Sequence, residues 1–118
     1  MEQKRILLVD DDEGIQLLYR EELEDEGYLV DSARNGIEGL KQFRDNPPDL
    51  VVLDINMPEM NGIEVLRQMK AERDSVPVIL SSAYHEYKQD LGSWASDAYV
   101  VKSVNTDELK STIRKLLS

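Results

Sequence analysis

Acidic residues follow two apolar runs of the sequence, at the points where a strand would end. Asp10 and Asp11 come directly after Ile6-Leu7-Leu8-Val9, and Asp54 comes directly after Leu50-Val51-Val52-Leu53. Parallel sheets bind ligands at the carboxyl ends of their strands, so we expect these three acids to share one crevice. Two carboxylates about 4 Å apart repel by roughly 4 kcal/mol at an effective dielectric of about 20. The cluster therefore predicts a divalent cation held by oxygen ligands, such as Mg²⁺, with Mn²⁺ as an alternative ion.

Two further polar residues are predicted to reach the same crevice. Ser82 ends the strand expected from the apolar run Val78-Ile79-Leu80, and Lys102 follows the run from 98 to 101. A lysine adds a fixed positive charge, and a hydroxyl offers a hydrogen-bond partner to a bound oxyanion. A nucleophilic carboxylate, a metal, a lysine and a hydroxyl are the groups that an aspartyl-phosphate site requires.

Short strands and amphipathic helices alternate along the chain and would position these groups. The continuous apolar runs at 6–9, 50–53 and 78–80 are typical of central strands buried on both faces, and the more mixed runs at 28–33 and 98–101 suit sheet edges. Helical spacing of apolar residues follows the first, second, third and fifth runs: Ile15, Leu18, Tyr19 and Leu23; Ile37, Leu40 and Phe43; Ile63, Leu66 and Met69; Leu109, Ile113, Leu116 and Leu117. A weaker helix is predicted within 84–96, where Leu91 and Trp94 are the strong apolar anchors.

Five βα units in series predict an α/β fold of the doubly wound, flavodoxin-like class. Right-handed crossovers give an open five-stranded parallel sheet with helices on both faces, in strand order 2-1-3-4-5. Local signals support the boundaries. Asn35-Gly36 turns the chain, Asn46-Pro47-Pro48 ends a helix, and Asn105 with Glu108 resembles a capping box before the last helix. Asp12 and Glu13 are expected to favour a helix N-terminus.

Composition bounds the class of protein. The 118 residues make one domain, 1–118, with a net charge of -10 and no cysteine. The negative charge argues against a direct nucleic-acid partner, because phosphate binding depends on clustered Lys and Arg. There is no apolar run long enough to span a membrane and no export signal in the sequence, so we expect a cytoplasmic protein without a membrane partner.

Taken together, the motifs resemble the receiver domain of two-component response regulators. The resemblance covers nearly the whole chain, through ILLVDD at 6–11, LDINMPEMNG at 53–62, PVILSSA at 77–83 and AYVVK at 98–102. It implies that Asp54 is the phosphoacceptor, and that Asp10, Asp11, Asp54 and the backbone carbonyl of Asn56 bind the metal. It further implies that Ser82 and Lys102 bind the phosphoryl group and that Ser82 and Tyr99 act as switch residues. Asn56 and Tyr84 are expected to tune access of water to the phosphoryl group.

The resemblance also implies partners. The phosphoryl donor would be a sensor histidine kinase or a phosphotransfer protein, and a downstream protein target would read the phosphorylated state. The chain would be a monomer or a phosphorylation-dependent dimer. It would not be an enzyme beyond its own phosphorylation and dephosphorylation.

One departure concerns the loop after Lys102. The family usually has a proline there in a cis peptide, whereas this chain has Ser103. A cis bond before a residue other than proline costs about 2.5 to 4 kcal/mol, which favours a trans Lys102–Ser103 bond.

Three alternative functions share parts of this pattern. A Mg²⁺-dependent aspartyl-phosphate phosphohydrolase needs a second acid two residues after its nucleophile, where this chain has Asn56. A flavodoxin-like cofactor binder needs a phosphate loop after the first strand, where Asp10 to Glu13 would repel an FMN phosphate. A degenerate receiver acting only as a binding module is disfavoured because no catalytic position is missing.

Overall fold

The computed structural model describes residues 3–55, 57, 62–82 and 97–118. The helix predicted within 84–96 lies outside these residues, and so do Asn56 and Tyr84. None of the helices in the described part of the chain is long and apolar enough to cross a membrane.

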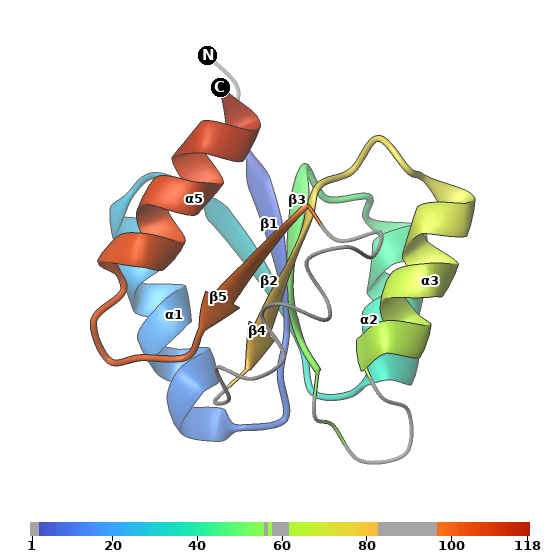
Figure 1. Ribbon diagram of the computed structural model, residues 1–118, viewed down its shortest axis with the longest axis horizontal. Helices are drawn as coiled ribbons and strands as arrows, with labels where there is room; N and C mark the ends of the chain where they lie inside the picture. Colours follow the sequence, from blue (N-terminus) through green and yellow to red (C-terminus); the bar gives the residue numbers. More distant parts are fainter. Residues whose placement is uncertain (1–2, 56, 58–61, 83–96) are drawn as a thin grey trace.

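Five parallel strands form a single sheet in the order β2-β1-β3-β4-β5 (Figure 1). The strands are β1 (Arg5–Val9), β2 (Leu29–Ala33), β3 (Leu50–Asp54), β4 (Val78–Ser82) and β5 (Ala98–Val101). The predicted strand order and the central position of the three apolar runs are therefore confirmed. Between β1 and β3 the chain reverses its direction of progress across the sheet, which is where such folds bind ligands.

In the described ranges, four helices cover the sheet: α1 (Glu13–Asp25), α2 (Gly36–Asp45), α3 (Gly62–Glu72) and α5 (Asp107–Leu117). Figure 1 shows α1 and α5 on one side of the sheet and α2 and α3 on the other. The strands separate two apolar clusters because successive strand residues point to opposite faces. Leu7 and Val9 belong to the cluster under α2 and α3, and Ile6 and Leu8 to the cluster under α1 and α5.

Helix α2 departs from the predicted apolar face at one residue. Ile37 was expected to be buried, but it is 59% exposed. The buried stripe of α2 consists of Gly36, Gly39, Leu40 and Phe43. Ile37 is one position, or about 100°, away from Gly36 on the helix, so its side chain lies on the solvent side.

A polar side chain caps α1 as predicted, whereas the cap predicted for α5 is not observed. Asp12 caps α1 by accepting the N–H groups of Gly14 and Ile15, as its predicted role at a helix N-terminus requires. The capping box predicted for Asn105 and Glu108 is wrong, because the residue that precedes α5 is Thr106 and its side chain makes no capping hydrogen bond.

The physical reason for that correction lies in helix α1. The Thr106 hydroxyl donates to the Glu22 carboxylate at 2.9 Å instead of accepting from its own helix. Asn105 still contributes, because its Oδ1 accepts the Asp107 N–H at 2.9 Å. The Thr106 hydroxyl is thus bound by a side chain of a distant helix and does not cap its own helix.

Candidate functional site

Three carboxylates meet at the carboxyl ends of β1 and β3. Asp10 is 1% exposed and Asp54 is 3% exposed, whereas Asp11 is exposed to solvent. One carboxylate oxygen from each residue lies within 4.8 Å of the others. The strands bring them together because β1 and β3 are neighbours, with Val9 paired to Leu53 just before the acids. The predicted convergence of these acids is therefore what the structure shows.

Lys102 reaches the cluster from the end of β5, across the intervening strand β4. Its Nζ lies 2.8 Å from Asp10 Oδ2 and 3.3 Å from Asp54 Oδ2. Burial by itself would lower the pKa of Lys102, but the hydrogen bond and the charges of Asp10 and Asp54 outweigh it and raise the pKa above its ordinary value. The ammonium group therefore stays protonated and partly neutralises two buried acids.

Ser82 lies beside Lys102 at the end of β4. It is fully buried and pairs in register with Val101. The Lys102 N–H donates to the Ser82 carbonyl at 2.7 Å, so the two residues are fixed to each other through the backbone. This backbone contact places the two residues predicted to bind the phosphoryl group next to each other.

Tyr99, the predicted switch aromatic, is a core residue. Its side chain is 8% exposed, and it pairs in register with Leu80. It belongs to the apolar cluster under α2 and α3. The ring is thus already inside the molecule in this structure.

The donor set of the cluster fits a hard divalent cation. The three residues offer carboxylate oxygens, which Mg²⁺ prefers, and no sulfur or imidazole ligand accompanies them in the described part of the chain. Asp11 faces solvent, where water molecules could complete the coordination. The predicted fourth ligand, the carbonyl of Asn56, lies outside the described residues.

Gly62 brings α3 against the backbone that follows Asp54. A Cβ placed on Gly62 would lie 2.3 Å from the Asp54 carbonyl oxygen and 2.7 Å from the Ile55 Cα. The Gly62 N–H donates to the Ile55 carbonyl at 2.8 Å. The close approach of Gly62 to the site backbone depends on tertiary packing that the sequence does not display.

Tyr19 was predicted as a core residue of the first helix, and the structure gives it a polar contact as well. Its hydroxyl accepts the Ser103 N–H at 3.4 Å, a donor that a proline at this position would lack. No cis peptide bond occurs in the described residues, so the bond from Lys102 to Ser103 is trans. Burial raises the pKa of Tyr19, which keeps the phenol neutral beside the lysine.

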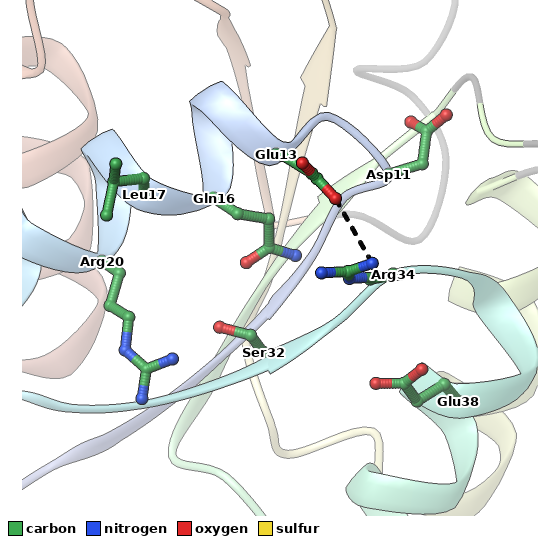
Figure 2. A pocket seen from close by; sticks show the side chains of 8 residues that line it. All are labelled: Asp11, Glu13, Gln16, Leu17, Arg20, Ser32, Arg34 and Glu38. Atoms are coloured by element: carbon green, nitrogen blue, oxygen red, sulfur yellow. Dashed lines mark ion pairs between the residues drawn. The ribbon is translucent and has the colours of Figure 1, made fainter.

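A pocket of about 430 Å³ lies beside the acid cluster, between α1, β2 and the start of α2. Figure 2 shows its lining, in which Arg34 pairs with Glu13 at 3.4 Å. Asp11 lies at the border between this pocket and the acid cluster, and Gln16 and Ser32 line the pocket floor. The sequence pattern predicts no role for Gln16.

This constellation is shared with a known family. Residues 6–114 match the model of the response regulator receiver domain. The chain belongs to this family. Its membership confirms the resemblance read from the motifs and weighs against the phosphohydrolase and flavodoxin-like alternatives.

Curated receiver-containing proteins align along nearly the whole chain. The response regulator MprA of Mycobacterium sp. (strain KMS) is 36% identical over 115 residues, covering 96% of this chain and 50% of MprA. The chain thus spans about half the length of this relative. Sporulation initiation phosphotransferase F of Bacillus subtilis is 35% identical over 119 residues, covering 99% of this chain and 96% of the relative.

Solved receiver structures show the same fold. The response regulator TrrA of Thermotoga maritima, crystallised in complex with Mg²⁺ and BeF, is 50% identical with a TM-score of 0.92. The match covers 98% of this chain and 100% of TrrA. TrrA in complex with the histidine kinase ThkA matches with a TM-score of 0.90.

Proposed function

We propose that this receiver domain, residues 1–118, accepts a phosphoryl group on Asp54 from a phosphohistidine of a partner protein. The observation that supports this most directly is the gathering of Asp10, Asp11 and Asp54 within 4.8 Å, with Lys102 in contact with two of them. Asp54 is the acid on β3, between the acid pair that follows β1 and Ser82 on β4. It is therefore the carboxylate best placed to receive a group bound by both sides.

In the proposed reaction, a carboxylate oxygen of Asp54 attacks the phosphorus atom of the phosphohistidine. A new O–P bond forms as the N–P bond breaks, and the imidazole nitrogen takes the electron pair and then a proton from solvent. Asp10, Asp11 and Asp54 would hold Mg²⁺, which when bound neutralises charge on the phosphoryl oxygens. Lys102 supplies a second positive charge, and Ser82 offers a hydroxyl to the transferred group.

The phosphorylated state would be read through the contact between Ser82 and Lys102. An acyl phosphate adds about -1.5 to -2 charges and three acceptor oxygens. Lys102 would exchange its contact with Asp10 for the phosphoryl oxygens, and Ser82 would move with it because their backbones are joined. The displacement would then reach Tyr99 in the neighbouring core and shift a conformational equilibrium toward binding of a downstream protein.

The donor in this proposal is a sensor histidine kinase or a phosphotransfer protein, and the output is protein contact. The kinase complex of TrrA supports the first choice. The net charge of -10 supports a protein surface rather than a nucleic acid as the target. Sedimentation with and without beryllofluoride distinguishes a monomer from a phosphorylation-dependent dimer.

The test of this function is labelling with acetyl [³²P]phosphate in the presence of Mg²⁺. Wild-type protein is expected to take up label, and chelation of the metal is expected to abolish the uptake. Asp54→Asn is expected to take up none. Asp25→Asn, which removes the same charge from the exposed end of α1, serves as the control and should label normally. Stable labelling of Asp54→Asn would contradict the proposal.

A further inference from the structure

The side chain of Gln16 ties helix α1 to the strand ends that carry the acid pair. Its Nε2 donates to the Asp10 carbonyl at 2.8 Å and to the Ala33 carbonyl at 2.8 Å. A longer contact of 3.4 Å joins it to the Leu8 carbonyl. Figure 2 shows the Gln16 carboxamide between α1 and Ser32 on β2. One amide thus bridges the carboxyl ends of β1 and β2.

The contact to Asp10 completes a set that fixes every polar group of that residue. The Asp10 N–H donates to the Ala33 carbonyl at 3.0 Å. Its Oδ1 accepts the Asp12 N–H at 2.9 Å, and its Oδ2 pairs with Lys102. Gln16 holds the remaining group, the carbonyl oxygen. Because that carbonyl belongs to the peptide plane shared with Asp11, the orientation of the next residue is fixed at the same time.

Asp11 depends on this plane more than Asp10 does. Its side chain is exposed and makes no hydrogen bond or ion pair with the described part of the chain. The position of its carboxylate in the acid cluster therefore depends on its own rotamer and on the backbone that carries it, and on no side-chain contact. Rotation of the peptide plane between Asp10 and Asp11 would move the Asp11 carboxylate relative to Asp54 without unfolding the sheet.

We propose that Gln16 is a positioning residue for the acid pair, which sets the Mg²⁺ affinity of the site by fixing the plane of the Asp10–Asp11 peptide. This inference rests on the proposed function for the identity of the ligand. Partners that orient metal-binding residues usually change metal affinity by about 10- to 100-fold when they are removed. Gln16 touches no ligand itself and acts through the backbone.

The carboxamide oxygen of Gln16 makes no contribution to packing that an apolar side chain could not make. Its Oε1 is buried and has no hydrogen-bond partner within the described residues. A buried acceptor without a partner costs free energy. An apolar side chain of the same size would fill this space without that cost. The presence of glutamine is therefore better explained by the hydrogen bonds that its Nε2 donates.

The test is calorimetric titration of Mg²⁺ into the unphosphorylated protein. Gln16→Met keeps the length and volume of the side chain and removes its donors, so the Mg²⁺ Kd is expected to rise about tenfold. Gln42→Met is the matched control. Gln42 also reaches from a helix to the end of β2, where it donates to the Ser32 carbonyl at 2.7 Å. It does not contact Asp10, and its variant should bind Mg²⁺ as wild type does.

A second measurement separates positioning from a loss of structure. The acetyl phosphate labelling rate of Gln16→Met should need about tenfold more Mg²⁺ for half-saturation and should approach the wild-type rate when Mg²⁺ is saturating. If Gln16→Met does not fold, Gln16→Asn replaces it, because a side chain one methylene shorter keeps the amide but loses its reach. The same rise in Kd is expected.

The outcomes distinguish the two proposals. A folded Gln16 variant whose Mg²⁺ Kd stays within about twofold of wild type would overturn the role of Gln16 and leave the phosphoacceptor proposal intact. Equal weakening by Gln42→Met would also overturn it, because the effect would then belong to the strand end in general. Failure of wild-type protein to bind Mg²⁺ would instead count against the proposed function.

Discussion

At the scale of single residues, the acid cluster depends on charge and also on the close approach of the Gly62 backbone to the backbone of Asp54. Asp54 ends β3, and the chain returns to it at Gly62, the first residue of α3. A side chain at Gly62 would occupy the space of the Asp54 carbonyl oxygen. The opposing group is backbone, so it cannot rotate away as a flexible side chain would.

Gly62→Ala is therefore expected to destabilise the protein although alanine is the better helix former. The helical preference is worth about 1 kcal/mol in favour of alanine, whereas relieving such an overlap typically costs about 1 to 3 kcal/mol or more. Urea unfolding measures the net change. Gly14→Ala is the control, because its Cβ would meet no backbone atom and only the Asp12 carboxylate oxygen, at 3.3 Å. Equal stability of Gly62→Ala and wild type would show that the backbone after Asp54 yields easily.

At the scale of secondary-structure elements, α1 and α5 are joined by one carboxylate. Glu22 Oε1 accepts from the Thr106 hydroxyl at 2.9 Å and from Lys110 Nζ at 2.6 Å. The hydrogen bonds from Lys110 and Thr106 lower the pKa of Glu22. A residue from α1 thus stabilises both the start and the first turns of α5.

This contact predicts a pH-dependent difference between wild type and Glu22→Gln. A carboxylate whose pKa is lowered by folding contributes stability above its unfolded pKa, near 4.5, and loses it as the pH falls through the folded value. Wild type should be the more stable protein at neutral pH, and the two unfolding free energies should converge below about pH 4.5. Glu21→Gln removes the same charge from the exposed neighbour and should show no such convergence. A constant difference across this range would contradict the assignment.

Elements also show where prediction from sequence succeeds. The apolar runs of β1, β3 and β4 are buried on both faces, and this unbroken pattern is what identified the central strands and placed Asp10 and Asp54 at their ends. Strand ends follow from the apolar pattern along the chain, so the residues at those ends could be predicted from the sequence. The contacts that helix side chains make could not be predicted in this way. Tyr19 and Glu22 contact residues more than 80 positions away, and Gln16 reaches the ends of β1 and β2. All three contacts depend on how α1 is rotated over the sheet.

At the scale of the whole molecule, a net charge of -10 accompanies a local concentration of three acids. General salt screens the overall repulsion, but a site-bound divalent ion acts only on the folded state. Binding of a ligand at about a hundredfold over its Kd stabilises a protein by about 2.7 kcal/mol. Screening and site binding can therefore be separated by comparing NaCl with a magnesium salt.

Mg²⁺ is therefore expected to raise the Tm by about 10 °C when saturating, beyond the rise that NaCl gives at the same ionic strength. Differential scanning calorimetry in the two salts measures the excess. Asp11→Asn should lose most of the excess, and Asp25→Asn should retain it. Identical melting curves in the two salts would mean that the ion acts only as a screening charge.

The position of Lys102 in the chain has a consequence for synthesis. Asp10 and Asp54 leave the ribosome well before the lysine that pairs with both of them. In any nascent chain that ends before residue 102, the two strand-end acids would meet without this countercharge. The last strand of the sheet is thus followed directly by the ammonium group that offsets the charge of the two buried acids.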